Sequence, residues 1–429
     1  MFAGIQNDTW GKSTTHKIVV PFYLYAALSF LACAIMLLFS AGAFKQHYFN
    51  PQLLAITHIM ALGWGTMIIL GASHQLVPVF TGKSLFSKRL AIFTFILAAA
   101  GIPLLIYGFY VFNMGWPAKW GGRFILLATI CYVINLTATI SKSRTKNIHT
   151  LFIISASAWL LFTVSFGLVL VYNFNYPFLE KESLVYLPLH AHAGIAGWFL
   201  LLVVGVGSRL IPMFLISKYS NTKLLWMIFI FINGGLISFM TLFLFFPGMN
   251  SFLISILLVM AGLLLFGYYC RQAWRHRLRK KLDEQMKISL LSVLMMLLPF
   301  FILLIMTGWL LTEEQNTRLV TTYGFVIFFG WITAIILGMT FKTLPFIVWN
   351  KVYHDKAGLG KTPSPKDLFS GKAFTVTGFS YLTGFILFIP GIYMAQTVML
   401  NTATVLLLIA ALFYNFNVLK IVLHKTKGS

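Results

Sequence analysis

Acidic side chains are scarce in this sequence, and cysteine is scarcer. The 429 residues include 9 Asp and Glu against 32 Lys and Arg, and only 3 cysteines. Cys33, Cys131 and Cys270 form no CxxC or CxxCH pattern, which argues against a disulfide framework and against covalent c-type haem attachment. Every Asp and Glu falls in a polar gap between hydrophobic runs, as expected where a carboxylate is too costly to bury in lipid.

Apolar residues make up 59% of the chain and charged residues only 10%. Segments long enough to cross a bilayer as helices occur at about 18 to 43, 52 to 80, 88 to 112, 121 to 141, 148 to 174, 186 to 216, 223 to 247, 250 to 272, 287 to 311, 318 to 348, 371 to 393 and 397 to 420. The pattern predicts an all-α polytopic membrane protein with about 12 transmembrane helices, forming a single transmembrane domain over residues 1–429.

The net charge of +23 belongs to the loops and tails. If the N-terminus is cytoplasmic, most Lys and Arg lie on that side, including the run RQAWRHRLRKK at 271 to 281. We therefore expect both termini to be cytoplasmic. The cations are spread over separate loops without a recognition motif, so they favour contact with lipid headgroups and not with nucleic acid.

An internal repeat is the most informative pattern. THIMALGWGTMIILGASHQLVPVF at 57 to 80 recurs as AHAGIAGWFLLLVVGVGSRLIPMF at 191 to 214 and as GFVIFFGWITAIILGMTFKTLPFI at 324 to 347. The spacing is one four-helix unit, which predicts three pseudo-symmetric repeats at approximately 18–141, 148–272 and 287–420, with the second, sixth and tenth helices lining the interior. The positions identical in all three copies are Gly63, Trp64, Gly71 and Pro78, then Gly197, Trp198, Gly205 and Pro212, then Gly330, Trp331, Gly338 and Pro345.

Histidines mark the start of two of the three copies. His58 corresponds to His192, and the third copy has Phe325 there, with Tyr323 matching His190. Two depth-matched intramembrane imidazoles suit the axial ligands of one haem, whereas a single histidine near a helix end is often only interfacial. His190 and His192 point roughly 200° apart on a helix, so they cannot share one ion but could serve two sites.

Polar residues recur near the other end of the repeat. His74 lies about 24 Å along the helix from His58, which favours a structural or interfacial role for it. The next position is polar in every copy, as Gln75, Arg209 and Lys342. These side chains could neutralise an anion or cap a helix, but the simplest expectation is that they extend to the headgroups.

The repeat and its histidines resemble the haem–copper oxidase subunit I superfamily, whose twelve helices form three four-helix arcs. The motifs THIMALGW and HAHAGIAGWF look most like small divergent members, including the NnrS family of haem- and copper-containing proteins linked to nitric oxide. The resemblance places His58 where the family has a haem ligand, and His192 or His190 where it has a copper ligand. It also implies a bacterial cytoplasmic (inner) membrane and an electron-donor or respiratory partner subunit.

Departures from the family pattern limit what can be carried over. The segment 223 to 247 contains no histidine to complete a three-histidine copper site, and the tenth helix contains none for either haem. We therefore expect a haem-binding protein that handles nitric oxide or transfers electrons, and not a complete terminal oxidase. The expected cofactor is haem b between His58 and His192, with copper at His190, alone or with His58, as a weaker variant. Whether the chain is an enzyme stays open, as do a small-solute or metal transporter and a cofactor-free scaffold.

Overall fold

The computed structural model describes residue 14 and residues 16–143, 147–246, 249–310, 316–356 and 362–425. The polar tails at both termini lie almost wholly outside these ranges. Within them, twelve helical spans are long and apolar enough to cross a membrane, so the prediction of an all-α integral membrane protein is confirmed.

The first four spans are α1 (His16–Ser40) with η2 (Ala41–Lys45), then α2 (Pro51–His58), η3 (Ile59–Thr66) and α3 (Met67–Thr81) as one span, then α4 (Lys88–Tyr110) and α5 (Trp116–Ser141). The next four are α6 (Ile148–Asn175), then α7 (Leu187–His192), η4 (Ala193–Leu200) and α8 (Leu201–Leu215) as one span, then α9 (Thr222–Phe245) and α10 (Met249–Arg275). The last four are α11 (Glu284–Met295) with α12 (Leu297–Leu310), then α13 (Thr317–Phe325), η5 (Val326–Ile332) and α14 (Thr333–Tyr353) as one span, then α15 (Gly371–Tyr393) and α16 (Thr397–Val422). Short 3-10 turns η6 (His354–Lys356) and η7 (Pro365–Leu368) follow α14.

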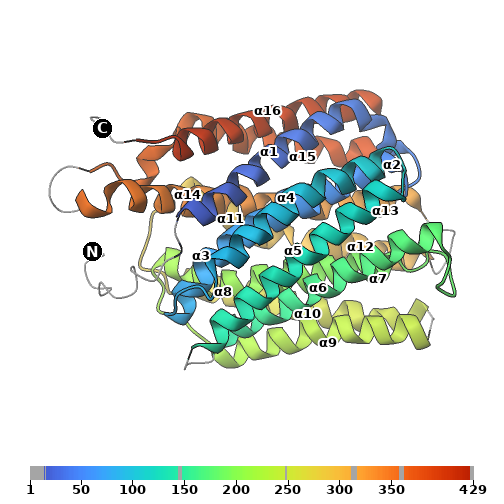
Figure 1. Cartoon of the computed structure of the whole chain (residues 1–429), viewed down its shortest axis with the longest axis horizontal. Helices are drawn as coiled ribbons and strands as arrows, with labels where there is room; N and C mark the ends of the chain where they lie inside the picture. The colour runs from blue at the N-terminus through green and yellow to red at the C-terminus, as the bar shows by residue number, and fades with distance from the viewer. Residues whose placement is uncertain are drawn as a thin grey trace.

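The helices run roughly side by side along the long axis of the molecule (Figure 1). We call the end where α2, α7 and α13 begin the histidine end, and the end where α3, α8 and α14 terminate the opposite end. The described chain starts and finishes at the opposite end, as an even number of spans requires (Figure 1).

The second, sixth and tenth spans form the centre of the bundle, as the repeat predicted. In their most apolar windows 72%, 67% and 83% of the residues are buried, whereas no other span exceeds 50%. Because the surrounding helices cover these three, most side chains in these windows face protein and not lipid. Any polar group on them is therefore a candidate for function.

Each central span contains a π-helical stretch at the same place, in η3, η4 and η5. A π-helical turn closes i→i+5 hydrogen bonds and so carries an extra residue, and it often marks a functional site. The stretch follows His58 in the first copy and His192 in the second. In the third copy Gly330 has φ −91° and ψ −111°, outside the helical region. No residue pattern in the sequence predicts this distortion.

Two indoles join the central spans to one another. Trp64 Nε1 donates to Thr333 Oγ1 at 3.1 Å, and Trp198 Nε1 donates to Thr66 Oγ1 at 3.0 Å. Thr66 and Thr333 hold the same position of the repeat, and the second copy has Leu200 there. Buried indole N–H groups are costly without a partner, so these bonds fix the relative rotation of the three helices.

Repeat glycines allow each central span to approach the first helix of its own copy. An added Cβ at Gly71 would lie 2.7 Å from Phe22 Cβ, and one at Gly205 would lie 2.9 Å from Phe152 Cγ. At Gly338 it would meet the backbone of α11, 2.8 Å from Gln285 O. Such contacts leave no room for any side chain.

A proline inside a helix removes one backbone hydrogen bond, so the repeat prolines predict a helix end or a kink near them. In the first two copies the helix does end three residues later, at Thr81 and Leu215. In the third copy α14 continues past Pro345 to Tyr353, so the helix does not end there.

Candidate functional site

His58 ends α2 and faces the centre of the bundle at the histidine end. Asn50 caps this helix by accepting a hydrogen bond from Leu53 N at 2.9 Å. His58 Nδ1 lies 2.8 Å from Leu54 O, and the ring packs edge-on against Phe109, with 4.6 Å between ring centres. The imidazole is thus held by its own helix and by α4.

His190 approaches from the neighbouring copy. It lies in α7, and its Nδ1 is 3.1 Å from Thr163 O of α6. A Cβ at Gly167 would lie 2.6 Å from His190 Cε1, so glycine at that position is what gives the ring its room. The α6 backbone therefore positions this imidazole as firmly as α2 positions His58.

The two rings face one another. Their centres are 6.2 Å apart and their planes differ by 18°. Because a carbonyl oxygen only accepts hydrogen bonds, Nδ1 of each ring must carry the hydrogen, which leaves Nε2 of each neutral ring with a free lone pair. Among the described residues neither Nε2 atom has a hydrogen-bond partner. Both imidazoles are therefore in the tautomer that binds a metal.

The spacing of the rings suits an ion between them. Metal–nitrogen bonds of about 2.0 Å on opposite sides of one ion place the two ring centres roughly 6 Å apart. The observed 6.2 Å agrees with that value, and it also lies within the range of offset-stacked rings. His58 and His190 thus form a two-imidazole site, which we call the histidine pair.

The pair borders a cavity of about 300 Å³, which we call the first cavity. The central spans, α4, α5 and α6 enclose it. None of the described residues that line it is charged, and its hydroxyl groups include those of Tyr48, Thr57 and Ser183. Its size falls within the range of pockets that hold organic ligands and cofactors.

His192 lies elsewhere. Its Nδ1 is 2.8 Å from Pro188 O, and its Nε2 is 3.2 Å from the Tyr323 hydroxyl. Both residues line a different space of about 450 Å³, the second cavity, between the central spans α7–α8 and α13–α14 and the helices α9, α10 and α12. His190 and His192 thus line different cavities. The structure brings His58 together with His190 and not with His192.

The two cavities hold corresponding pairs of residues. His58 and His192 occupy the same repeat position, and each bonds the carbonyl four residues before it. His190 and Tyr323 also correspond to one another. In the third copy the position that matches His58 and His192 holds Phe325, which stacks on Phe388 with 4.3 Å between ring centres. The counterpart of His190 and Tyr323 in the first copy is Ile56, so the third place holds no polar pair.

A larger metal cluster is not found in the described part of the chain. No three or more His, Cys, Asp or Glu side chains are grouped there so that they could hold one ion. His74 lies near the opposite end, fully buried between Phe22 and Tyr132, which agrees with the structural role expected for it.

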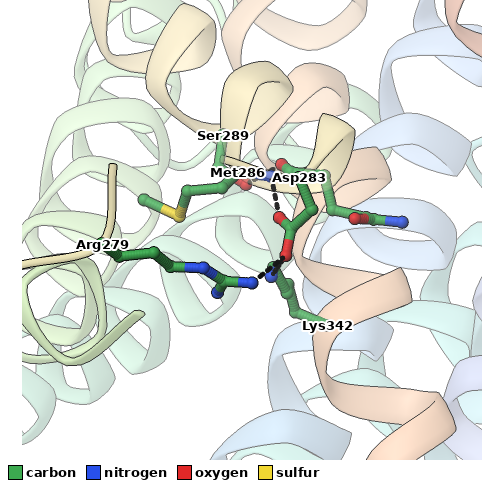
Figure 2. A network of polar contacts seen from close by, with 6 residues as sticks. Arg279, Asp283, Met286, Ser289 and Lys342 are labelled. Carbon is green, nitrogen blue, oxygen red and sulfur yellow. Dashed lines mark hydrogen bonds and ion pairs between the residues drawn. The ribbon is translucent and has the colours of Figure 1, made fainter. Parts of the chain in front are cut away.

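Lys342 was expected to extend toward headgroups, and this is wrong. Its side chain is 11% exposed and pairs with Asp283, which also accepts from Arg279 at 3.3 Å (Figure 2). Asp283 caps α11 as well, accepting from Met286 N at 3.2 Å. One carboxylate thus ties α14, the start of α11 and the preceding loop together, because a half-buried ammonium requires an anion nearby.

Asp283→Asn tests the ion pairs of this carboxylate with Lys342 and Arg279 apart from the helix cap, because asparagine keeps the cap. We expect the variant to lose about 1–3 kcal/mol of stability, since Lys342 is left half-buried without its anion. The measurement is thermal unfolding in detergent. Glu284→Gln is the matched control, because it breaks only the exposed pair with Lys287 and should cost under about 0.5 kcal/mol. Equal midpoints for the two variants would contradict the assigned role.

Sequence reasoning did not find Thr163 and Gly167, which hold the His190 ring. Nothing at these positions in the sequence signals the role, because it depends on how α6 packs against α7. No protein-family model matches this chain, and no curated protein matches it.

Proposed function

We propose that the chain is a haem-binding membrane protein that transfers electrons or handles nitric oxide, with His58 and His190 as the axial ligands. One observation carries the proposal: two imidazoles whose Nε2 atoms have no hydrogen-bond partner among the described residues lie with their ring centres 6.2 Å apart, close to the separation of two imidazoles on one metal ion.

The first cavity favours haem over a bare ion. Copper held by His58 and His190 would need only the gap between the rings, whereas a planar macrocycle needs open space around the ion. The cavity of about 300 Å³ beside the pair supplies that space. Its apolar walls suit the porphyrin ring, and Tyr48 offers a hydroxyl donor at the cavity edge. The residues therefore fit the group.

A haem with two imidazole ligands supplies one-electron chemistry when bound. The chain's own contribution is positional. Leu54 and Thr163 carbonyls fix the two ring tautomers, Phe109 supports the first ring, and the apolar walls exclude water. His192 takes no part in this pair, because its ring lines the second cavity.

We place the protein in a bacterial inner membrane with both termini in the cytoplasm, on the strength of its basic loops and twelve apolar spans. An electron-donor or respiratory subunit is the partner that this function requires. The histidine end then faces outward, with the pair about one turn or two below the surface.

A reduced-minus-oxidised optical spectrum of the purified protein tests the proposal. We expect a Soret band with sharp reduced bands of a six-coordinate b-type haem. If the spectrum does not change with carbon monoxide or nitric oxide, electron transfer is favoured, whereas a shift favours nitric oxide chemistry. A featureless spectrum from well-folded protein expressed with abundant haem contradicts the proposal, and metal analysis of the same sample then detects copper if the pair holds an ion instead.

A further inference from the structure

The second cavity is larger than the first and has its own polar pair. Its volume is about 450 Å³, and none of the described residues lining it is charged. Two of its hydroxyls are already used: Ser255 bonds Ser238 at 2.8 Å, and Thr307 donates to Leu303 O at 2.8 Å. His192, Tyr323 and the Tyr48 hydroxyl remain as polar groups among the described lining residues at its histidine end, and of these His192 and Tyr323 form a hydrogen-bonded pair.

The direction of their hydrogen bond is set by the helix. Because His192 Nδ1 donates to Pro188 O, its Nε2 can only accept, so the Tyr323 hydroxyl donates to it. The phenolic oxygen of Tyr323 then keeps free lone pairs that can accept a hydrogen bond from a ligand. The pair is thus prepared for a molecule that offers a hydroxyl group.

The remaining walls describe the rest of that molecule. Phe239 packs edge-on against the His192 ring at 5.2 Å between ring centres, and it contacts Phe243 and Phe252 in the same wall. Aromatic edges and aliphatic chains favour a flat ring with an apolar tail. A fatty acid or phospholipid would bring a charge that no lining side chain balances.

We propose that the second cavity binds a lipid-soluble quinol, whose ring hydroxyl donates to Tyr323 and whose tail lies along the apolar walls. Tyr323 corresponds in the repeat to His190 of the first cavity, so the second cavity has a hydroxyl group where the first has an imidazole. The inference does not rest on haem binding, because it uses only residues of the second cavity and their hydrogen bonds.

Calorimetric titration of the full chain in nanodiscs with decylubiquinol tests the site. We expect saturable binding that weakens about tenfold in Tyr323→Phe, which keeps the ring and removes the hydroxyl. His192→Leu should weaken binding similarly, because it frees the tyrosine to rotate. Tyr107→Phe is the matched control, since Tyr107 is 61% exposed on α4 and lines neither cavity. It should bind as the unaltered chain does.

A second variant keeps the test decisive if the polar variants misfold. Leu303→Trp fills the cavity from α12 without touching the polar pair, and it should also reduce binding. The proposal is overturned if Tyr323→Phe and His192→Leu bind the quinol as tightly as the unaltered chain. Equal binding of decylbenzene, which has no hydroxyl group, overturns it as well. Failure of haem binding leaves these expectations unchanged, so the two proposals fail separately.

Discussion

Leucine in place of either His58 or His190 is expected to reduce haem content more than about tenfold, since losing an axial ligand exceeds the effect of losing a supporting hydrogen bond. Leucine keeps the cavity apolar and adds no competing ligand. The measurement is the pyridine haemochrome of protein purified from cells supplied with haem, divided by protein concentration. Residual haem in either variant should have lost the six-coordinate spectrum.

The matched control is His192→Leu, which removes an imidazole at the same depth but in the second cavity. We expect it to keep the haem and its spectrum. The control also separates two pairings, because the sequence alone suggested His58 with His192. Haem loss in His192→Leu together with retention in His190→Leu would contradict the pair that the structure brings together.

Gly338→Ala should destabilise the protein by about 3 kcal/mol or more. The new methyl group would lie 2.8 Å from Gln285 O and 3.0 Å from Ser289 N, both backbone atoms of α11 that cannot rotate away. The helices must separate, which also disturbs the nearby contact between Lys342 and Asp283. Thermal unfolding in detergent and the monodisperse fraction on size exclusion measure the effect.

Gly267→Ala is the control for the same chemical change. Gly267 lies within α10, and an added Cβ there meets nothing within 4 Å. Alanine in a helix interior is about 0.5–1 kcal/mol more favourable than glycine, so this variant should be as stable as the unaltered chain or more so. If Gly338→Ala unfolds no earlier than Gly267→Ala, close packing at the repeat glycine does not matter for stability.

Much of the fold was predictable because hydrophobic length is a strong signal in a membrane protein. The predicted segments and the observed spans differ mostly by a few residues at their ends. The largest shift at a start is in α5, which begins at Trp116 and not at 121, because Trp116, Pro117 and Lys119 start the helix among polar neighbours. Hydropathy does not detect a helix turn made of such residues.

The histidine pairing was not predictable from the repeat alone. Corresponding residues such as His58 and His192 lie at matched depth, and this suggested that they share a ligand. Each of the three central helices, however, has a central helix on either side, and it presents a different face to each of these two neighbours. Residues two apart on a helix differ by about 200°, so His190 turns back toward His58 while His192 turns toward Tyr323.

The first and last helices of the bundle are joined by contacts between residues far apart in the sequence. Helix α16 packs against α1, and Asn415 Nδ2 donates to Ala27 O at 2.8 Å across that junction. Neither residue belongs to the repeat motifs. The sequence therefore indicated three units but gave no sign of which side chains join the last unit to the first.

The number of residues in each π-helical stretch helps to set the geometry of the site. A regular α-helix turns about 100° per residue. Deleting Ala61 from η3 would therefore restore regular α-helix only if α2 rotated relative to α3 about the helix axis. His58 would rotate away from His190, although every residue that contacts the pair would still be present. Substitutions keep the number of residues in the helix, so they do not change this rotation. Single-residue deletions within η3, η4 and η5 test how the rotation of each helix end affects the site.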